Sequence, residues 1–330
     1  MNILIVNDSK IPATRYGGTE RVIWGLGKCL SDMGHAVTFL VAQGSSCPFG
    51  RVIEWDKSKD INSLIPEDID VMHLNQQANF PLHKPYISTF HGNVNHPFTF
   101  DKNTVFISKN QANRFHGDTF VYNGLDWDVY DKPLLDNKRK YFHFLGDASW
   151  KVKNVKGAIE LTRKAKETLY VLGGARLNLN MGFRFTTDLH VRFKGMVDDR
   201  KKKQYLQESK GLIFPVLWHE PFGLAIIESM FFGCPVFGSA YGSLPELITA
   251  ETGISSNNMN ILVEGIKDAE RFSKKICHQY AADKFNATVM ANNYLALYQK
   301  VLSGESIHTT NPCFKEEDII HVKRLPMEYF

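Results

Sequence analysis

Residues 222–232 read FGLAIIESMFF, a run in which Glu228 is the only charged side chain. The run predicts a short helix that is apolar on almost every face, and such a helix belongs inside a large fold. A carboxylate buried there without a partner is costly, so another group must satisfy Glu228.

A second glutamate, Glu220, lies eight residues upstream, just before a turn marked by Pro221 and Gly223. Because the N-terminus of a helix exposes backbone N–H groups, the start of this helix attracts an anion. Two hydrogen-bond acceptors that flank an anion site suit a sugar nucleotide, which carries hydroxyl groups on both sides of its phosphates. The residues alone leave a second interpretation open, in which Glu228 pairs with a Lys or Arg of the core.

The sequence around the two glutamates resembles a known signature. His219-Glu220-Pro221-Phe222-Gly223-Leu224 is followed by Glu228, then by Gly233-Cys234-Pro235-Val236 and Leu244-Pro245-Glu246. This pattern closely resembles the E-x7-E signature of retaining glycosyltransferases of family 4, also called glycosyltransferase group 1. The resemblance covers about residues 1–302 and is strongest over 211–247. It implies the α/β fold named GT-B, in which two Rossmann-like, doubly wound parallel-sheet domains face each other across a cleft.

The resemblance also implies an activity. The expected enzyme moves a sugar from a nucleoside-diphosphate sugar to an acceptor hydroxyl with retention of the anomeric configuration, in glycan, polysaccharide or glycoconjugate synthesis. The expected acceptor is a glycan, a lipid-linked molecule or a small molecule, and neither a metal nor a cofactor is expected. Two rivals remain: a sugar-nucleotide epimerase of the same fold, and a non-catalytic sugar-nucleotide-binding protein.

A length of 330 residues favours two domains. Residues 1–137 alternate expected strands and helices, which is typical of a parallel doubly wound sheet. The expected strands are Ile3–Val6, Ala36–Val41, Val71–Leu74, Tyr86–Phe90, Val105–Ile107 and Phe120–Val121. The stretch 123–140, rich in Asp, Lys, Gly and Pro, is the expected boundary.

The alternation resumes in the second domain, residues 138–287. Its expected strands are Tyr141–Leu145, Leu169–Leu172, Val191–Phe193, Gly211–Phe214 and Pro235–Phe237, and its expected helices include Val155–Lys166 and Asn258–Ala282. From the resemblance, a final helix at residues 288–302 packs back on the first domain. Residues 303–330 form a tail whose path the sequence does not reveal.

Three residues of the first domain are candidate ligand contacts. Gly17 and Gly18 precede a helix, where glycines let the backbone approach a ligand closely. The resemblance places this glycine loop beside the donor phosphates or the acceptor. His91 follows the strand Tyr86–Phe90, at the strand end where ligands of such sheets bind. The resemblance implies that this histidine faces the donor sugar, and His91 is therefore a catalytic candidate.

Two lysines follow the first strand of the second domain. The family usually has a G-R…K-G stretch here, with the arginine and lysine binding the diphosphate. This chain has Asp147 where the arginine is usual, and the loop is one residue longer. Lys153 is the better match to the family lysine, as a catalytic and donor-binding residue, and Lys151 is expected to supply the missing positive charge.

The remaining candidates also come from the resemblance. Glu220 is expected to orient the sugar and Glu228 to accept hydrogen bonds from the ribose hydroxyls. The stretch Pro221, Phe222, Gly223 and Leu224 is expected to present backbone N–H groups to the diphosphate. Met196 and Val197 resemble the loop that contacts the nucleobase.

The charge is unevenly distributed. Residues 1–137 contain 12 Lys and Arg against 15 Asp and Glu, a net of −3, and the remainder contains 27 against 20, a net of +7. A basic second domain fits a polyanionic nucleotide. Nucleic acid is not an expected partner, because the basic residues are dispersed apart from Arg200–Lys203, which we interpret as a solvated helix face.

Composition sets further limits. The five cysteines are scattered and odd in number, so neither a disulfide framework nor a zinc site is expected, and a reducing cytoplasm fits best. No apolar run of about 18 residues occurs, so no transmembrane segment is expected, although peripheral contact with the inner face of the membrane is compatible with the sequence. The sequences Asp68–Asp70 and Asp126–Asp128 match the metal-binding pattern D-x-D, but three letters are a weak signal and no metal is expected.

Overall fold

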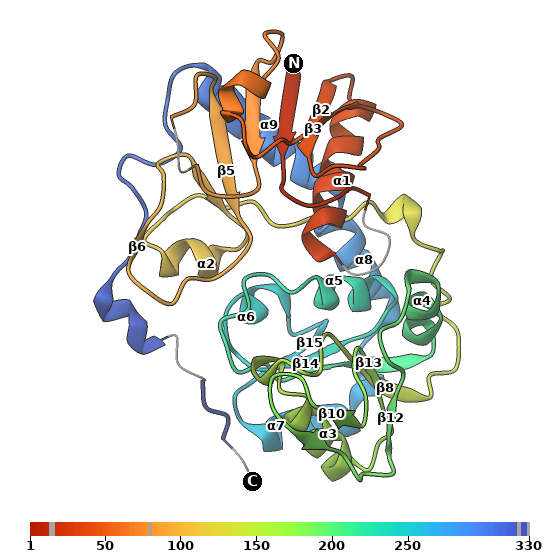
Figure 1. Ribbon diagram of the computed structural model, residues 1–330. Coiled ribbons are helices and arrows are strands. Elements are labelled where there is room, and N and C mark those ends of the chain that lie inside the picture. The colour runs from red at the N-terminus through yellow and green to blue at the C-terminus, as the bar shows by residue number, and fades with distance from the viewer. Residues whose placement is uncertain (13–16, 79–80, 322–324, 329–330) are drawn as a thin grey trace. The chain divides into compact units, whose positions relative to one another are not determined.

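The computed structural model describes residues 1–12, 17–78, 81–321 and 325–328 (Figure 1). The chain forms two compact units. The first comprises residues 1–129 and 284–319, and the second comprises residues 130–283 and 320–330. Each unit is built on one six-stranded sheet.

The sheet of the first unit has the strand order β3-β2-β1-β4-β5-β7, with all neighbours parallel. Its strands are β1 (Asn2–Val6), β2 (Ala36–Val41), β3 (Arg51–Glu54), β4 (Val71–Leu74), β5 (Tyr86–Phe90) and β7 (Thr104–Phe106). The chain begins at the centre, runs to one edge, returns, and continues from β4 to the other edge. The sheet is therefore doubly wound, with its switch point between β1 and β4.

Two of these findings differ from the sequence prediction. The edge strand β3 was not predicted, because its partly exposed residues lack the apolar run of a central strand. The predicted strand Phe120–Val121 is absent, since Phe120 makes only an isolated bridge to Phe106.

Helices of the first unit pack on this sheet through apolar stripes. The helix α1 (Gly18–Asp32) buries Val22, Ile23, Leu26 and Leu30, which share one face at helical spacing. The helix α9 (Ala287–Leu302) lies against α1 and β5. Its Tyr298 hydroxyl lies 2.7 Å from His73 Nδ1 of β4, so a buried polar contact fixes the helix on the sheet. The remaining short elements are η1 (Ile61–Leu64), β6 (Phe98–Thr99), α2 (Lys109–Arg114), η2 (Trp127–Val129) and β16 (Cys313–Phe314), which pairs with β6.

The sheet of the second unit has the order β12-β9-β8-β13-β14-β15 and is also parallel throughout. Its strands are β8 (Tyr141–Leu145), β9 (Leu169–Leu172), β12 (Val191–Phe193), β13 (Ser209–Phe214), β14 (Val236–Gly238) and β15 (Gly253–Ser255). The switch point lies between β8 and β13. The separate antiparallel pair β10 (Leu177–Asn178) and β11 (Arg184–Phe185) follows β9.

The helices of the second unit are α3 (Val155–Ala165), α4 (Asp199–Gln207), α5 (Leu224–Phe231), α6 (Leu244–Leu247), α7 (Met259–Lys267) and α8 (Lys274–Lys284), with the 3₁₀ turns η3 (Lys151–Lys153) and η4 (Ala269–Arg271). The single helix predicted over Asn258–Ala282 is therefore wrong. The chain breaks between α7 and α8, which lets Ala269 and Phe272 enter the core that also contains Phe237.

The last residues divide between the two units. Residues 303–319 belong to the first unit, where Cys313 pairs with Thr99. A 3₁₀ turn η5 (Glu316–His321) follows. In the second unit Leu325 N donates to Leu217 O at 3.0 Å, and Met259 N donates to Glu328 O at 3.1 Å.

No helix in the described part of the chain has both the length and the apolar character needed to cross a membrane.

Candidate functional site

The predicted site residues of the second unit lie in the loops that follow its parallel strands. Residues 146–154 follow β8, residues 194–197 follow β12, and residues 215–223 follow β13. In doubly wound sheets, ligands bind outside the carboxyl ends of the strands at the switch point. The loops after β8 and β13 flank the switch point of this unit, and they supply Lys153 and Glu220.

Lys153 and Glu220 form a largely buried ion pair. Lys153 Nζ lies 2.6 Å from Glu220 Oε2, and Trp218 Nε1 donates to the same oxygen at 2.8 Å. The ammonium group also lies over the Trp218 ring, 4.9 Å from its centroid. The two predicted residues, 67 positions apart in sequence, are thus brought together beside an aromatic wall.

The loop that contains Glu220 is fixed by Gly242 and Ser243. A Cβ at Gly242 would come within 2.4 Å of Glu220 backbone atoms, and the residue has φ +63°, so only glycine fits here. Ser243 N donates to Glu220 O at 3.0 Å, and Ser243 Oγ donates to Phe222 O at 2.6 Å. The loop therefore has a defined path into α5.

The predicted backbone contacts lie at the start of α5. Gly223 precedes the helix in the left-handed region, with φ +91°. Pro221 and Phe222 are buried, so these two residues can offer a ligand their backbone but not their side chains. Leu224 is the first residue of the helix, whose N-terminus favours an anion.

Glu228 lies on α5 and is held by two groups. The Tyr130 hydroxyl donates to Glu228 Oε1 at 2.7 Å, and Lys202 Nζ lies 2.5 Å from the same oxygen. Lys202 also lies 3.2 Å from Asp199 Oδ1. The sequence interpretation in which Glu228 pairs with a core lysine is therefore realised in the structure, and the partner is Lys202.

The interpretation of Arg200–Lys203 as a solvated face is wrong at Lys202. That residue is only 8% exposed, whereas Arg200 and Lys201 are exposed. The reason is helical spacing: Lys202 and Leu206 are four residues apart on α4 and form its buried face. Leu206 packs in the core, and Lys202 meets the carboxylate that α5 buries.

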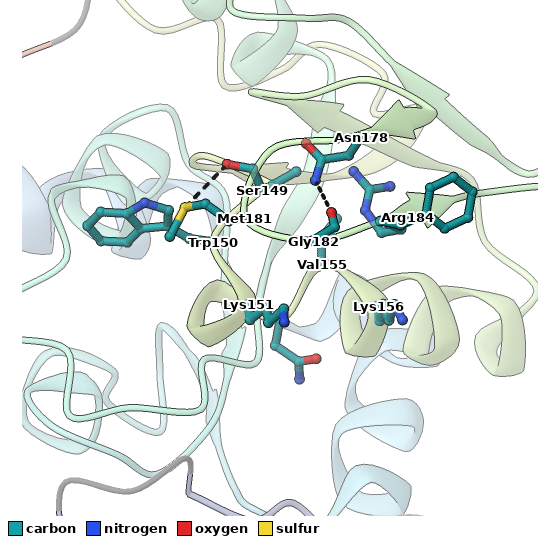
Figure 2. A pocket seen from close by; sticks show the side chains of 12 residues that line it. Ser149, Trp150, Lys151, Val155, Lys156, Asn178, Met181, Gly182 and Arg184 are labelled. Atoms are coloured by element: carbon teal, nitrogen blue, oxygen red, sulfur yellow. Dashed lines mark hydrogen bonds between the residues drawn. The ribbon is translucent and has the colours of Figure 1, made fainter.

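Lys151 and Lys153 diverge because they flank one 3₁₀ turn. Lys153 meets Glu220, whereas Lys151 lines a cavity of about 290 Å³ beside the β10–β11 hairpin (Figure 2). Asp147, which stands where the family has an arginine, accepts from Ser149 N at 2.8 Å and from Ser149 Oγ at 2.6 Å. Its carboxylate therefore shapes the loop.

Met196 and Val197 follow β12 in an exposed turn. Gly195 has φ +70°, and its carbonyl accepts from Gly173 N at 2.8 Å. This bond joins the loop after β12 to the loop after β9. Met196 itself is exposed.

The first unit carries the other predicted residues at its own switch point. Gly17 caps α1 and Gly18 begins it. His91 follows β5, and its Nε2 lies 2.9 Å from Oδ1 of Asn75, which follows β4. Burial lowers the pKa of His91 to about 4, so the ring is neutral at pH 7.

Several residues that sequence reasoning missed position these groups. Gln111 Nε2 donates to Phe90 O at 3.1 Å and to Gly92 O at 2.8 Å, which fixes the backbone on both sides of His91. Tyr130, Lys202 and Trp218 hold the two glutamates. Lys202 was assigned to a solvated basic run, and the other three belong to no motif that the sequence analysis used, so only their spatial neighbours reveal their roles.

One residue of each D-x-D sequence contacts a cation, Asp68 at the surface and Asp126 with a side chain that is only 13% exposed. Arg51 Nη2 lies 3.0 Å from Asp68 Oδ1, and Lys28 Nζ lies 3.5 Å from Asp126 Oδ2. Across the described ranges, no group of three or more His, Cys, Asp or Glu side chains is arranged to hold a metal ion.

Sequence comparison gives similarity over part of the chain. Residues 127–284 match the family model of glycosyl transferases group 1. An uncharacterised 41.2 kDa protein in the cps region of Klebsiella pneumoniae is 33% identical over 118 residues, which cover 33% of this chain and 32% of that protein. A GDP-mannose-dependent α-(1-6)-phosphatidylinositol dimannoside mannosyltransferase of Mycobacterium tuberculosis is 36% identical over 75 residues, 23% of this chain and 20% of that enzyme. The matched stretches thus span about a third or less of these relatives.

Structural similarity covers almost the whole chain. The crystal structure of AviGT4, a glycosyltransferase involved in avilamycin A biosynthesis, superposes with a TM-score of 0.74 at 17% identity. The superposition covers 92% of this chain and 98% of that one. The predicted fold class is confirmed: the chain has the GT-B fold of two Rossmann-like domains, and its residues 127–284 match the glycosyl transferases group 1 family.

Proposed function

We propose that this chain is a retaining glycosyltransferase of family 4 type, which transfers a sugar from a nucleoside-diphosphate sugar to an acceptor hydroxyl. The observation that carries the proposal is the Lys153–Glu220 pair at the switch point of the second unit, directly before α5. A cation, a carboxylate and a helix N-terminus in one place suit a ligand that has both phosphates and sugar hydroxyls.

In this proposal Lys153 stabilises the leaving diphosphate. An ammonium group has three N–H donors, so Lys153 can keep its bond to Glu220 and still donate to a phosphate oxygen. The backbone at Gly223 and Leu224 adds the partial positive charge of the α5 N-terminus. Electrostatic stabilisation of the charge that develops on the leaving group is then the main catalytic term. Lys151 is a second, weaker candidate for the same diphosphate.

Glu220 and Glu228 are proposed to accept from hydroxyl groups. Glu220 would orient the donor sugar. Glu228 would accept from the ribose through Oε2, because Tyr130 and Lys202 both contact Oε1. Met196 and Val197 would contact the nucleobase.

The residues of the first unit are proposed to have ligand-binding roles of their own. His91 would face the donor sugar as a neutral imidazole, and the backbone at Gly17 and Gly18 would approach the donor phosphates or the acceptor. The leaving phosphate would accept the acceptor proton as the new bond forms on the same face of the sugar. Neither a metal nor a cofactor is part of the proposal.

The similar proteins suggest which donor and which acceptor to test first. The name of the mycobacterial relative, a GDP-mannose-dependent α-(1-6)-phosphatidylinositol dimannoside mannosyltransferase, supports GDP-mannose as a first donor and a lipid-linked glycan among the acceptors. A thermal-shift screen of UDP, GDP and ADP sugars identifies the donor. Turnover followed by NMR then gives the product anomer, and an inverted anomer would contradict the retaining mechanism.

The same assay tests the need for metal. Activity is expected to survive EDTA, because lysine and helix amides supply the positive charge. A strict requirement for Mn²⁺ or Mg²⁺ would contradict this part of the proposal.

A non-catalytic sugar-nucleotide-binding protein is the second candidate. Asp147 favours this alternative, because a carboxylate stands where the family has a diphosphate-binding arginine. The Asp147 carboxylate accepts from Ser149 N. Slow donor hydrolysis without acceptor would contradict this alternative, whereas donor binding without hydrolysis or transfer would support it. An epimerase would instead release an altered nucleotide sugar.

A further inference from the structure

The hairpin of the second unit has an unusual side-chain pattern. Residues 177–185 read LNLNMGFRF, with an apolar residue at every odd position. Leu177 lies opposite Phe185 and Asn178 lies opposite Arg184 across the two strands. Because successive side chains of a strand point to opposite faces, Leu177 and Phe185 lie on one side of the strand pair and Asn178 and Arg184 on the other, and residues 179–183 form the turn that joins the strands.

The apolar face of the hairpin is turned outward. Leu179 is 72% exposed and Phe183 is 74% exposed, and Leu189, just beyond the hairpin, is 91% exposed. Leu177, Met181 and Phe185 are exposed as well. An antiparallel strand pair normally packs its apolar face on the core and leaves its polar face in water. Large exposed apolar groups that gather in this way mark an interaction surface.

Arg184 fixes this orientation from the inner side. The residue is buried, and its guanidinium donates to Thr186 Oγ1 at 2.8 Å and to Ala175 O at 3.0 Å. It also lies over the Phe193 ring, 5.0 Å from the centroid. Since the arginine is satisfied inside, the outward apolar face is a stable property of the fold.

The base of the hairpin is positively charged. The cavity of about 290 Å³ beside it is lined by the exposed cations Lys151 and Lys156 and by the buried Arg184, and no acidic side chain is among its described lining residues (Figure 2). Trp150 lies at the same cavity and is partly exposed. The surface therefore combines exposed Leu, Met and Phe side chains with cations and a tryptophan.

We propose that this hairpin binds the surface of an anionic phospholipid bilayer. Its Leu179 and Phe183 side chains would enter the interfacial region, and Lys151 and Lys156 would face the lipid phosphates. Apolar insertion and electrostatic attraction together give stable interfacial binding, and tryptophan is favoured at this depth. The positive charge favours anionic lipid over a second copy of this chain, which would present the same cations. Because Lys151 is also a candidate for the donor diphosphate, the charge of this surface is tested at Lys156, which has no role in the proposed transfer.

The test is co-flotation of the full chain with lipid vesicles. Vesicles of phosphatidylcholine mixed with phosphatidylglycerol are expected to bind the protein at least about tenfold more strongly than phosphatidylcholine alone. The double variant Leu179→Ser/Phe183→Ser is expected to lower that binding about tenfold or more. The matched control is Ile276→Ser, which removes an exposed apolar side chain on α8 and should bind as the wild type does. Lys156→Glu should weaken binding to the anionic vesicles only.

Two outcomes would overturn the proposal. One is failure of the wild type to bind the phosphatidylglycerol vesicles. The other is binding of the double variant that equals that of the wild type. The melting temperature of the double variant should be unchanged because both side chains are exposed, and this measurement shows that the variant is folded. If instead the wild type dimerises without lipid and the double variant does not, the occupant is a second copy of the chain and the membrane proposal fails.

Discussion

Lys202→Met tests whether α4 and α5 are joined by a buried ion pair. Methionine keeps a long unbranched side chain and removes only the ammonium group. That group lies 2.5 Å from Glu228 Oε1, and both side chains are about nine-tenths buried. The substitution therefore leaves a buried carboxylate without its countercharge.

The expected loss follows from the geometry. Removing one partner of a buried ion pair costs about 3–5 kcal/mol, because the other charge stays buried and uncompensated. The Tyr130 hydroxyl still donates to Glu228 at 2.7 Å, so we expect the lower end of that range. A unit of this size melts about 2–4 °C lower for each kcal/mol lost, which gives a fall of roughly 6–12 °C. Scanning calorimetry measures it.

The neighbouring Lys201→Met is the matched control. Lys201 lies on the same helix and is exposed, and lysine and methionine have similar helix propensity, so the change should stay within about 0.5 kcal/mol. Combining Lys202→Met with Glu228→Gln removes both charges. The double variant should lose about 2 kcal/mol less free energy of unfolding than the sum of the losses in the two single variants. Equal melting temperatures for the Lys202 and Lys201 variants would refute the buried pair.

Three further predictions concern the proposed site and the core. Glu228→Gln should weaken nucleotide binding by roughly 1.5–3 kcal/mol, because a charge-assisted bond to ribose is lost, and unchanged affinity in calorimetric titration would leave Glu228 a purely structural role. Lys153→Ala should lower kcat by roughly 10²–10³ and Lys151→Ala by much less, since only Lys153 lies beside Glu220; equal small effects on turnover would rule out the diphosphate assignment. Burial lowers the pKa of His143 to about 3, below its value in the unfolded chain. The native state therefore binds fewer protons than the unfolded state, so the contribution of His143 to the free energy of unfolding should fall by about 2 kcal/mol from pH 6.5 to pH 5. The urea midpoint of unfolding should change less steeply with pH in His143→Gln than in the wild type. An equal dependence on pH in both proteins would contradict the buried neutral ring.

Local pattern was enough to predict the two-sheet architecture. Buried strands such as Val71–Leu74 and Tyr86–Phe90 are short apolar runs between turn signals, and the structure confirms both as β4 and β5. The stretch 222–232 predicted a buried helix, and α5 is that helix. These features depend on residues close together in sequence, so their periodicity is visible without the fold.

Side-chain partners could not be predicted, because they depend on how separate elements pack. The sequence required a partner for Glu228, but only the orientation of α4, which buries Lys202 and Leu206, selected Lys202 rather than its neighbours in the basic run. Likewise, the resemblance favoured Lys153 over Lys151, but only the structure shows that the 3₁₀ turn directs Lys153 toward Glu220.

The hairpin shows the same division most clearly. The sequence prediction contained no hairpin at residues 177–185, where the structure has two-residue strands joined by a turn. Which face meets water is decided by tertiary contacts, here the buried bonds of Arg184 to Thr186 and Ala175. The sequence by itself therefore determined most of the buried strands, the helix α5 and the chemistry of the loops, and the tertiary structure decided which charges meet and which apolar groups stay exposed.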